Sequence, residues 1–168
     1  MSDKVWSVLV LCTGNSARSI LGEALLGRMG EGRIRAFSAG SKPKGVPHPG
    51  ALRYLAANGY DLAAFRSKSW DEFASAASSP IDIAITVCGN AAGEACPIFT
   101  GAPVRTHWGL PDPADVEGSE EEVDAAFART AKLLEMRISA FLALPLDTLS
   151  PTELRNALNI IGQMEGVA

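Results

Sequence analysis

The sequence predicts an α/β protein in which helices flank both faces of a parallel sheet, giving three layers. Two observations lead to this prediction. Short runs of β-branched and aliphatic residues alternate with longer segments whose apolar residues recur at helical spacing, an order typical of βαβ units. The clearest short runs show little alternation of apolar and polar residues, as expected of parallel strands covered on both faces.

The chain begins with a strand, a helix and a second strand. Residues 5–11 are aliphatic and β-branched over the length of a strand. Residues 17–29 repeat apolar side chains at helical spacing until Gly30 and Gly32 end the helix. Residues 33–38 form a second short strand, and a loop rich in proline follows it.

The middle of the chain is predicted to hold two helices and two strands. A helix over residues 50–58 stops at Gly59, and a shorter helix covers residues 69–77. Residues 81–87 and residues 104–108 form the third and fourth strands. In a parallel sheet the carboxyl ends of these strands converge on one edge, where ligands bind.

Two helices complete the predicted fold. Ser119 and Glu122 have the spacing of a capping box and open a long helix that continues to about Leu142. Residues 150–168 begin with a short helix, a C-terminal extension that packs on the core or serves a partner. Without repeats or a linker, the 168 residues fit one domain over residues 1–168.

The composition is that of a folded protein with little charge bias. Hydrophobic residues make up 47% of the chain, which argues against disorder, and the formal net charge of −4 offers no basic stripe for nucleic acid. No segment approaches the roughly 20 apolar residues of a membrane span, and the N-terminus lacks a signal-peptide cleavage site. We therefore expect a soluble cytoplasmic protein with neither nucleic acid nor a membrane as partner.

The three cysteines are Cys12, Cys88 and Cys96. An odd count without a secretory signal argues against a structural disulfide framework. Seven residues separate Cys88 from Cys96, wider than the usual half of a zinc site, and the chain has only two histidines. We therefore expect reactive thiols and no metal.

The strongest functional signal is the segment from Cys12 to Ser19, which joins the first strand to the first helix. The C-x5-R spacing lets a short loop wrap around a tetrahedral anion, with backbone N–H groups pointing inward at a helix N-terminus. The positive electrostatic field at the helix N-terminus also favours the thiolate form of Cys12, which is the nucleophile. Arg18 can donate two hydrogen bonds to two oxygens of the anion. The other predicted oxyanion-binding residues are Thr13, Gly14, Asn15, Ser16, Ala17 and Ser19.

Within this loop Gly14 permits a close backbone approach, and Asn15 tolerates the left-handed conformation that such loops require. Ser16 and Ser19 can donate hydroxyl hydrogen bonds to the thiolate or the ligand. The alternative is a buried structural cysteine followed by an arginine at an arbitrary distance. The position of the motif between a strand and a helix argues against it.

Asp112 lies between Pro111 and Pro113 after the predicted fourth strand. The two prolines restrict the backbone and hold the carboxyl group in few positions. Close to the anion, such an acid can protonate a leaving oxygen. An ordinary turn aspartate is the alternative, and this segment alone does not separate the two.

Together these segments resemble the low-molecular-weight protein tyrosine phosphatase family over roughly residues 5 to 143. The resemblance rests on residues 10–19, residues 38–40 and the pair Asp112-Pro113, which follow the family's pattern in order. It implies the family's four-stranded parallel sheet with flanking helices. The roles it implies are nucleophile for Cys12, anion clamp for Arg18, loop support for Asn15 and Ser19, and general acid for Asp112.

Within that family the chain resembles the arsenate reductases more than the phosphatases. Its loop reads Thr-Gly-Asn-Ser over residues 13–16, and Ala114 follows Asp112-Pro113 where the phosphatases usually carry an aromatic residue. Cys88, followed by Gly-Asn, and Cys96, followed by proline, look like the redox pair of the reductases. The predicted activity is therefore the reduction of arsenate.

The proposed reaction uses three thiols in turn. Cys12 attacks arsenic, Cys88 attacks Cys12 as arsenite leaves, and Cys96 attacks Cys88. No bound cofactor is expected, because an external thiol reductant would reduce the final disulfide: the third cysteine favours thioredoxin over glutathione, glutaredoxin or another low-molecular-weight thiol. Two features depart from the family pattern. Ala17 replaces a second loop cysteine of many relatives, and the Cys88–Cys96 spacing is one residue longer than in the best-known thioredoxin-coupled members.

The sequence leaves two other functions open. Arsenate and phosphate share shape and charge, so the loop also fits a phosphatase that hydrolyses phosphoesters through a phosphocysteine, in which Cys88 and Cys96 would be small buried side chains. Ala114 argues against that reading. A module that binds oxyanions or senses redox state without catalysis is disfavoured by the intact set of Cys12, Arg18 and Asp112.

Overall fold

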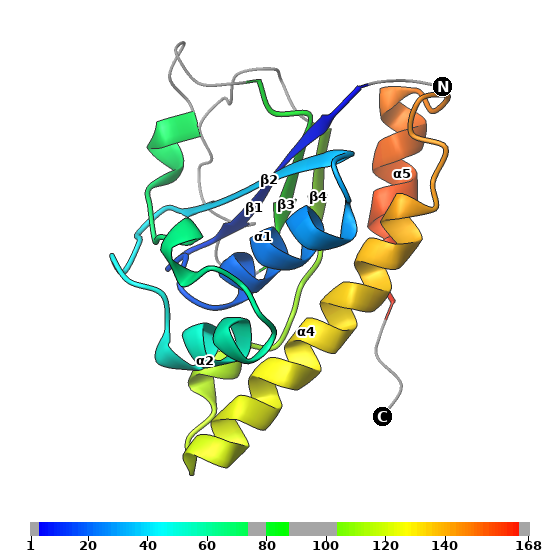
Figure 1. Ribbon diagram of the computed structural model, residues 1–168. Helices are drawn as coiled ribbons and strands as arrows, with labels where there is room; N and C mark the ends of the chain where they lie inside the picture. Colours follow the sequence, from blue (N-terminus) through cyan, green and yellow to red (C-terminus); the bar gives the residue numbers. More distant parts are fainter. Residues whose placement is uncertain (1–3, 74–79, 88–103, 165–168) are drawn as a thin grey trace.

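The computed structural model describes residues 4–73, 80–87 and 104–164. Four strands form one parallel sheet in the order β2-β1-β3-β4 (Figure 1), which confirms the predicted four-stranded parallel sheet. The strands are β1 (Trp6–Cys12), β2 (Ile34–Gly40), β3 (Ile83–Thr86) and β4 (Val104–His107).

The α-helices of the described residues follow the predicted segments closely, and they are α1 (Arg18–Met29), α2 (Pro49–Ala57), α4 (Glu120–Leu142) and α5 (Pro151–Ile161). Three short 3₁₀ helices lie between them: η1 (Leu62–Ala64), η2 (Trp70–Phe73) and η3 (Pro113–Asp115). None of the helices in the described ranges is long and apolar enough to cross a membrane.

The prediction of an α-helix over residues 69–77 is wrong in its described part, where the chain forms the 3₁₀ helix η2. Ser69 makes a parallel bridge to Gly40, and the Ser69 hydroxyl accepts a hydrogen bond from the backbone of Asp71. The chain is therefore extended up to Ser69 and then turns tightly, because a side-chain bond of this kind competes with helical pairing. Residues 74–79 lie outside the described residues.

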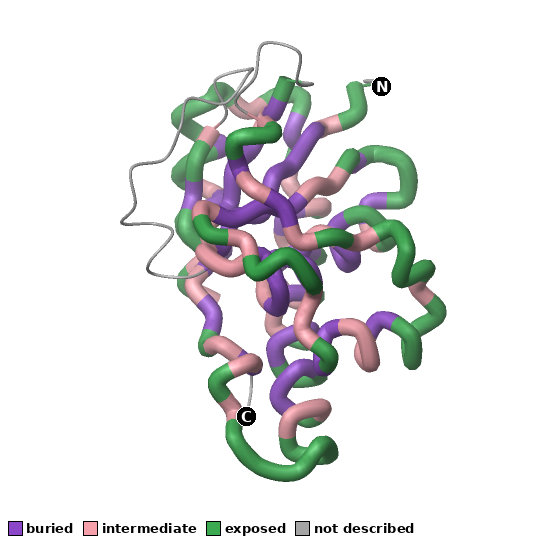
Figure 2. The backbone as a smooth tube through the Cα atoms, turned by 90° about the vertical axis from the view of Figure 1, so that its left-hand side faces the viewer, coloured by how far each residue is buried: buried purple, intermediate pink, exposed green. Residues whose placement is uncertain are grey.

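The central strand β1 contributes to two cores because its side chains alternate between the faces of the sheet. Val8 and Val10 belong to the larger core, which α1, α4 and α5 cover. Leu9 and Leu11 belong to the second core, where they pack with Trp70 of η2. Buried residues accordingly follow the strands through the middle of the molecule (Figure 2).

The parallel register places the loops after β1 and β4 at the same edge of the sheet. Cys12 ends β1 opposite Gly40, and His107 ends β4 opposite Thr86. Asp112 follows five residues after His107, so the nucleophile candidate and the acid candidate approach each other. Cys88, which follows β3, lies outside the described residues.

Side-chain caps fix where the last two helices begin. The Ser119 hydroxyl accepts a hydrogen bond from the backbone of Glu122, which is one half of the predicted capping box; the Glu122 carboxylate accepts from the Ser119 hydroxyl instead of from its backbone. At α5 a complete capping box forms, since Ser150 and Glu153 each bind the backbone of the other. α5 then packs beside β4 and buries Leu154, Leu158 and Ile161 in the larger core.

The Leu158→Ala substitution tests whether α5 is part of the core. Leu158 is 0% exposed, and its truncation should lower the free energy of unfolding by about 2–5 kcal/mol. Ile160 on the same helix is 66% exposed, so Ile160→Ala is the matched control and should change stability by less than about 0.5 kcal/mol. Urea denaturation measures both, and equal effects would show that α5 does not pack as described.

Candidate active site

The predicted anion loop curls around a pocket at the carboxyl end of β1. Cys12 is the last residue of the strand and is 7% exposed, and Arg18 is the first residue of α1. Among the described residues, no side chain caps this helix N-terminus, so its first-turn N–H groups suit an anion. The pocket has a volume of about 220 Å³ and is lined by residues 12–18 together with Lys42, Lys44 and Asp112.

Asn15 gives the loop its curvature. Its φ of 44° lies in the left-handed region, which asparagine tolerates better than most residues. The side chain is 0% exposed and is bound at both ends: Nδ2 donates to Ser19 Oγ at 2.8 Å, and Oδ1 accepts from the backbone N–H of Lys68 at 2.9 Å. These bonds support the role expected of Asn15 and Ser19 in holding the loop.

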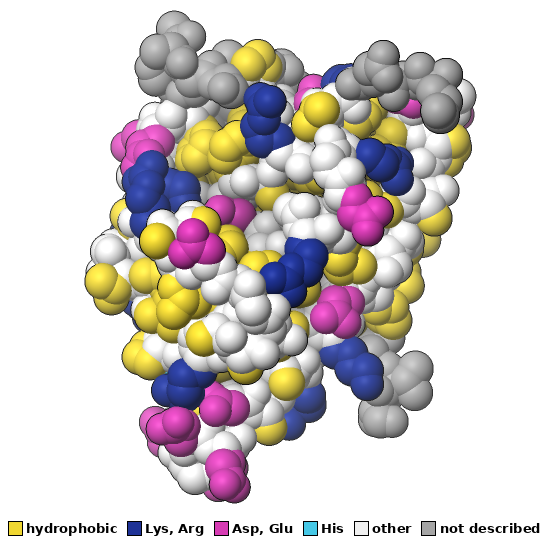
Figure 3. All heavy atoms as spheres, in the orientation of Figure 1, with side chains coloured by type: hydrophobic (Ala, Val, Ile, Leu, Met, Phe, Trp, Pro, Cys, Tyr) yellow, Lys and Arg dark blue, Asp and Glu magenta, His cyan; other side chains and the backbone are white. Residues whose placement is uncertain are grey.

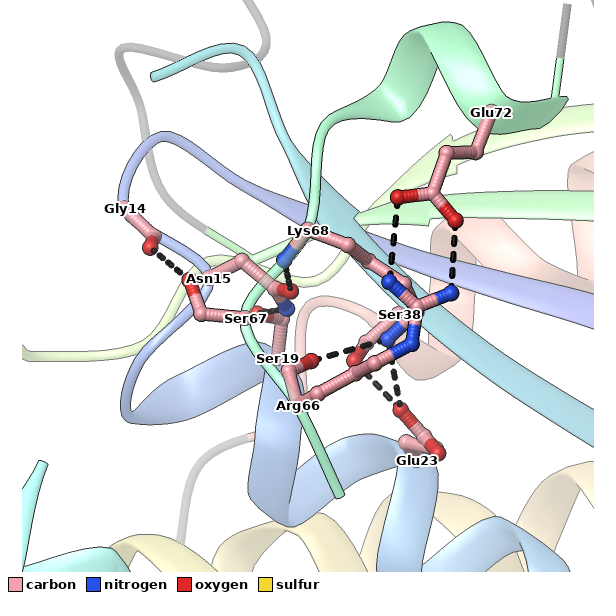
Figure 4. Close-up of polar contacts among 9 residues, drawn as sticks. All are labelled: Gly14, Asn15, Ser19, Glu23, Ser38, Arg66, Ser67, Lys68 and Glu72. Atoms are coloured by element: carbon pink, nitrogen blue, oxygen red, sulfur yellow. Dashed lines mark hydrogen bonds and ion pairs between the residues drawn. The ribbon is translucent and has the colours of Figure 1, made fainter. Parts of the chain in front are cut away.

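A buried polar network supports the loop from the side of α1 and β2 (Figure 4). Lys68 Nζ lies 3.7 Å from Glu23 Oε1, and the Ser38 hydroxyl donates to the same carboxylate oxygen. Ser67 Oγ donates to the carbonyl of Gly14 at 3.2 Å. The segment that carries Lys68 therefore contacts the loop through two consecutive residues.

Burial shifts the pKa values of Glu23 and Lys68, the two charged residues of this network. Removal from water raises the pKa of Glu23, and the hydrogen bond from Ser38 and the positive charge of Lys68 oppose that rise without cancelling it. Burial likewise lowers the pKa of Lys68, against the attraction of Glu23. Each ion is thus costly to bury alone, and each depends on its partner.

The loop between β2 and α2 runs along the anion loop and is bound to it by backbone hydrogen bonds. The N–H groups of Lys42, Lys44 and His48 donate to the carbonyls of residues 13, 14 and 16 at 2.9, 3.0 and 2.8 Å. Gly40 begins this contact. A Cβ atom there would lie 2.4 Å from the carbonyl oxygen of Thr13 and 2.6 Å from that of Cys12, so only glycine permits the approach.

His48 has a structural role in this arrangement. Its Nδ1 accepts from the backbone of Gly50 and caps α2, and its ring stacks on Phe127 with centroids 5.2 Å apart. Burial, aided by the charge of Lys44, lowers the pKa of His48, which favours the neutral ring that this cap requires.

Arg18 is held by the segment that follows β4. Its Nη1 donates to the carbonyl of Leu110 at 2.9 Å, and its Nη2 lies 3.3 Å from Asp112 Oδ2. Its Nε is buried and has no hydrogen-bond partner among the described residues. The two terminal nitrogens are thus oriented by contacts outside the anion loop, while the residue as a whole lines the pocket.

Asp112 combines the contact of a turn aspartate with a position at the anion pocket. Its Oδ1 accepts from the backbone of Ala114 at 3.0 Å, as a turn aspartate does, and this bond begins η3. Its Oδ2 faces Arg18 and lines the anion pocket. The turn therefore fixes one oxygen while the other stays at the site.

Sequence reasoning missed several residues of this site. Lys42 and Lys44 line the pocket, and Glu23 and Lys68 support it from behind. The segment over residues 38–40, which resembles the family pattern, was the available signal for the loop that follows. Within the described ranges, no group of three His, Cys, Asp or Glu side chains is arranged to hold a metal ion. The predicted redox residues Cys88 and Cys96 lie outside those ranges.

Comparison with known proteins shows which family and which characterised proteins this chain resembles. The family described as "Low molecular weight phosphotyrosine protein phosphatase" matches residues 7–155. An arsenate reductase of Halalkalibacterium halodurans is 34% identical over 141 residues, which cover 84% of this chain and 96% of that protein.

Two solved structures share the fold. One, described as an arsenate reductase in the phosphate binding state, is 25% identical with a TM-score of 0.59, covering 80% of this chain and 98% of the other. The tyrosine phosphatase Wzb from Escherichia coli K30, in complex with sulphate, is 26% identical with a TM-score of 0.60, covering 81% and 95%. Reductases and phosphatases are therefore both among the structural neighbours.

The buried pair of Lys68 and Glu23 predicts strong coupling between two substitutions. Lys68→Met should lower the free energy of unfolding by about 3–5 kcal/mol, because it leaves Glu23 buried without its cation. Adding Glu23→Gln should restore part of that loss. Urea denaturation of the two single variants and the double variant at neutral pH gives the coupling energy, with the exposed Lys132→Met as control. Additive effects would contradict the prediction.

Proposed function

The chain belongs to the low molecular weight phosphotyrosine protein phosphatase family, and on this premise we propose that it is an enzyme that reduces arsenate to arsenite. The observation that carries the proposal is the anion pocket, which Cys12 and Arg18 line together with the backbone of the loop between them and with Asp112. Support for arsenate as substrate comes from the relatives, since the reductase from Halalkalibacterium halodurans matches over almost its whole length.

The first step takes place within the loop. The Cys12 thiolate attacks arsenic(V) and forms a sulfur–arsenic bond, while an oxygen leaves as water with a proton supplied by Asp112. The loop amides and Arg18 hold the remaining oxygens. What supports this assignment is that Asp112 lines the pocket and lies 3.3 Å from Arg18.

The second step transfers electrons from thiols to arsenic. The Cys88 thiolate attacks Cys12 sulfur, a disulfide forms, and the electron pair of the sulfur–arsenic bond stays on arsenic, which leaves as arsenite. Cys96 then attacks Cys88, frees Cys12, and leaves a Cys88–Cys96 disulfide for an external dithiol such as thioredoxin to reduce. The support for this relay is the sequence, in which Cys88 directly follows the segment that extends β3.

Hydrolysis of phosphoesters is a second candidate function, because a tyrosine phosphatase has a similar fold. In that reaction Cys12 would attack phosphorus, and Asp112 would protonate the leaving alcohol. Ala114 argues against an aromatic substrate. It follows the acid in place of an aromatic side chain, and its backbone N–H is bound to Asp112.

Lys42 and Lys44 give the pocket a local positive charge that the whole chain lacks. Both side chains are exposed at its rim, whereas the chain has a net charge of −4. On the face seen in Figure 3, basic and acidic side chains are interspersed. Attraction of a small dianion therefore depends on the charges at the loop.

Arsenate-dependent consumption of NADPH, coupled through thioredoxin and its reductase, tests the proposed reaction. Turnover should be lost in Cys12→Ser, because the nucleophile is removed. Cys88→Ser and Cys96→Ser should lose multiple turnover and still bind oxyanion. Arsenite formation in a single turnover should persist in Cys96→Ser and fail in Cys88→Ser.

Hydrolysis of p-nitrophenyl phosphate by the same samples is the companion measurement. Efficient hydrolysis without arsenate turnover by any thiol donor would make the protein a phosphatase. Full reductase activity in Cys88→Ser would refute the relay while leaving the arsenate reaction in place.

The rim lysines predict a salt-dependent affinity. The double variant Lys42→Gln/Lys44→Gln should raise KM for arsenate about threefold at low salt and leave kcat within about twofold, because long-range attraction is lost. The difference from wild type should shrink as ionic strength increases. Lys132→Gln on α4 is the matched control. A KM that stays unchanged at low salt would show that the lysines do not attract the substrate.

A further inference from the structure

The segment Trp108–Leu110 joins β4 to Asp112, and we call it the approach segment. On one side it continues the sheet: Trp108 N–H donates to the carbonyl of Thr86 at 2.7 Å, and Leu110 N–H donates to that of Val87 at 3.1 Å. The Leu110 carbonyl in turn accepts from Arg18 at 2.9 Å. The backbone between the sheet and the acid is therefore part of the site.

Helix α5 holds the approach segment from the other side. The Trp108 ring is 1% exposed, and its Nε1 donates to the carbonyl of Leu158 at 3.0 Å. Thr106, two residues earlier, donates its hydroxyl to Asn159 Oδ1 at 2.6 Å. A Cβ atom at Gly162 would lie 2.5 Å from the His107 carbonyl oxygen, so the end of α5 lies in close contact with the end of β4.

Arg137 of α4 connects the approach segment to the chain just after α5. Its side chain is buried, and the residue is 3% exposed. Nη1 donates to the carbonyl of Gly109 at 3.1 Å, while Nε and Nη2 donate to the carbonyl of Met164 at 3.1 and 2.9 Å. One planar guanidinium thus binds the approach segment and the chain that leaves α5, an arrangement that lysine cannot reproduce.

We propose that Arg137 and α5 form a clamp that positions Asp112 for catalysis. Gly109 precedes Asp112 by three residues, and Pro111 lies between them. Because proline restricts the backbone, a shift of Gly109 is passed on to the acid rather than absorbed. Leu158 and Asn159 of α5, and Gly162 and Met164 just after it, lie beyond the family match, which ends at residue 155.

The clamp acts through geometry. Proton transfer requires hydrogen-bond distance, and a displacement of about 1 Å can cost up to about a hundredfold in rate. Arg137 is therefore a positioning residue, because the described residues that line the anion pocket do not include it. The proposal rests on the assignment of Asp112 as general acid.

The test is a double-mutant cycle between Arg137→Met and Asp112→Asn, read by single-turnover formation of arsenite. Arg137→Met should lower the rate about tenfold in the wild-type background and less than twofold in the Asp112→Asn background, with inhibition by phosphate unchanged within twofold. Arg137→Lys should recover part of the rate. Arg53→Met, which removes a contact of 2.8 Å between α2 and Asp124 of α4, is the control for destabilisation and should keep the rate within twofold.

Hydrogen exchange gives a readout that does not need activity. The Ala114 amide is bound to Asp112 Oδ1, and it should exchange at least fivefold faster in Arg137→Met and stay unchanged in Arg53→Met. If the wild type forms no arsenite, the proposed function fails, and this measurement still tests the clamp. Equal loss of rate in both backgrounds, or unchanged exchange at Ala114, would overturn the proposal.

Discussion

The whole anion site depends on the two hydrogen bonds made by the buried side chain of Asn15. A left-handed residue in the middle of the loop is costly unless its surroundings hold it, and these bonds anchor it to Ser19 on α1 and to the segment at Lys68. The curl they maintain turns the chain from the end of β1 into the start of α1. Cys12 and Arg18 can line one small pocket only because that turn is tight.

Two cations serve this loop in different ways. Arg18 faces the pocket and pairs with Asp112, so its orientation is fixed before any anion arrives. Lys68 faces the network behind the loop and pairs with Glu23, where it supports structure. A charge held in place like that of Arg18 can stabilise a transition state without reorganisation. The buried pair of Lys68 and Glu23 connects two segments that lie far apart in the sequence.

Local patterns predicted much of the fold and the centre of the site. Aliphatic runs predicted β1 and β3, and the spacing of Cys12 and Arg18 identified the anion loop, because both signals lie within a few residues of sequence. Contacts between distant residues were not predictable. Lys68 binds Asn15 across 53 residues, and Arg137 binds Gly109 across 28 residues. The spacing of apolar residues along the sequence does not indicate such pairs. The helix predicted over 69–77 was wrong at its start for the same reason, since the bridge from Ser69 to Gly40 decided the local conformation.

The position of α5 also affects whether two molecules of this protein can associate through the edges of their sheets. β4 is one of the two outer strands of the sheet, and an outer strand is a template for pairing with another chain. Here the strand is four residues long, carries an exposed Arg105 and has α5 packed beside it. These features are the ones that natural proteins use against edge-to-edge aggregation. If α5 positions Asp112 as we propose, loosening this helix would slow catalysis and would also make the β4 edge of the sheet easier for a second molecule to reach.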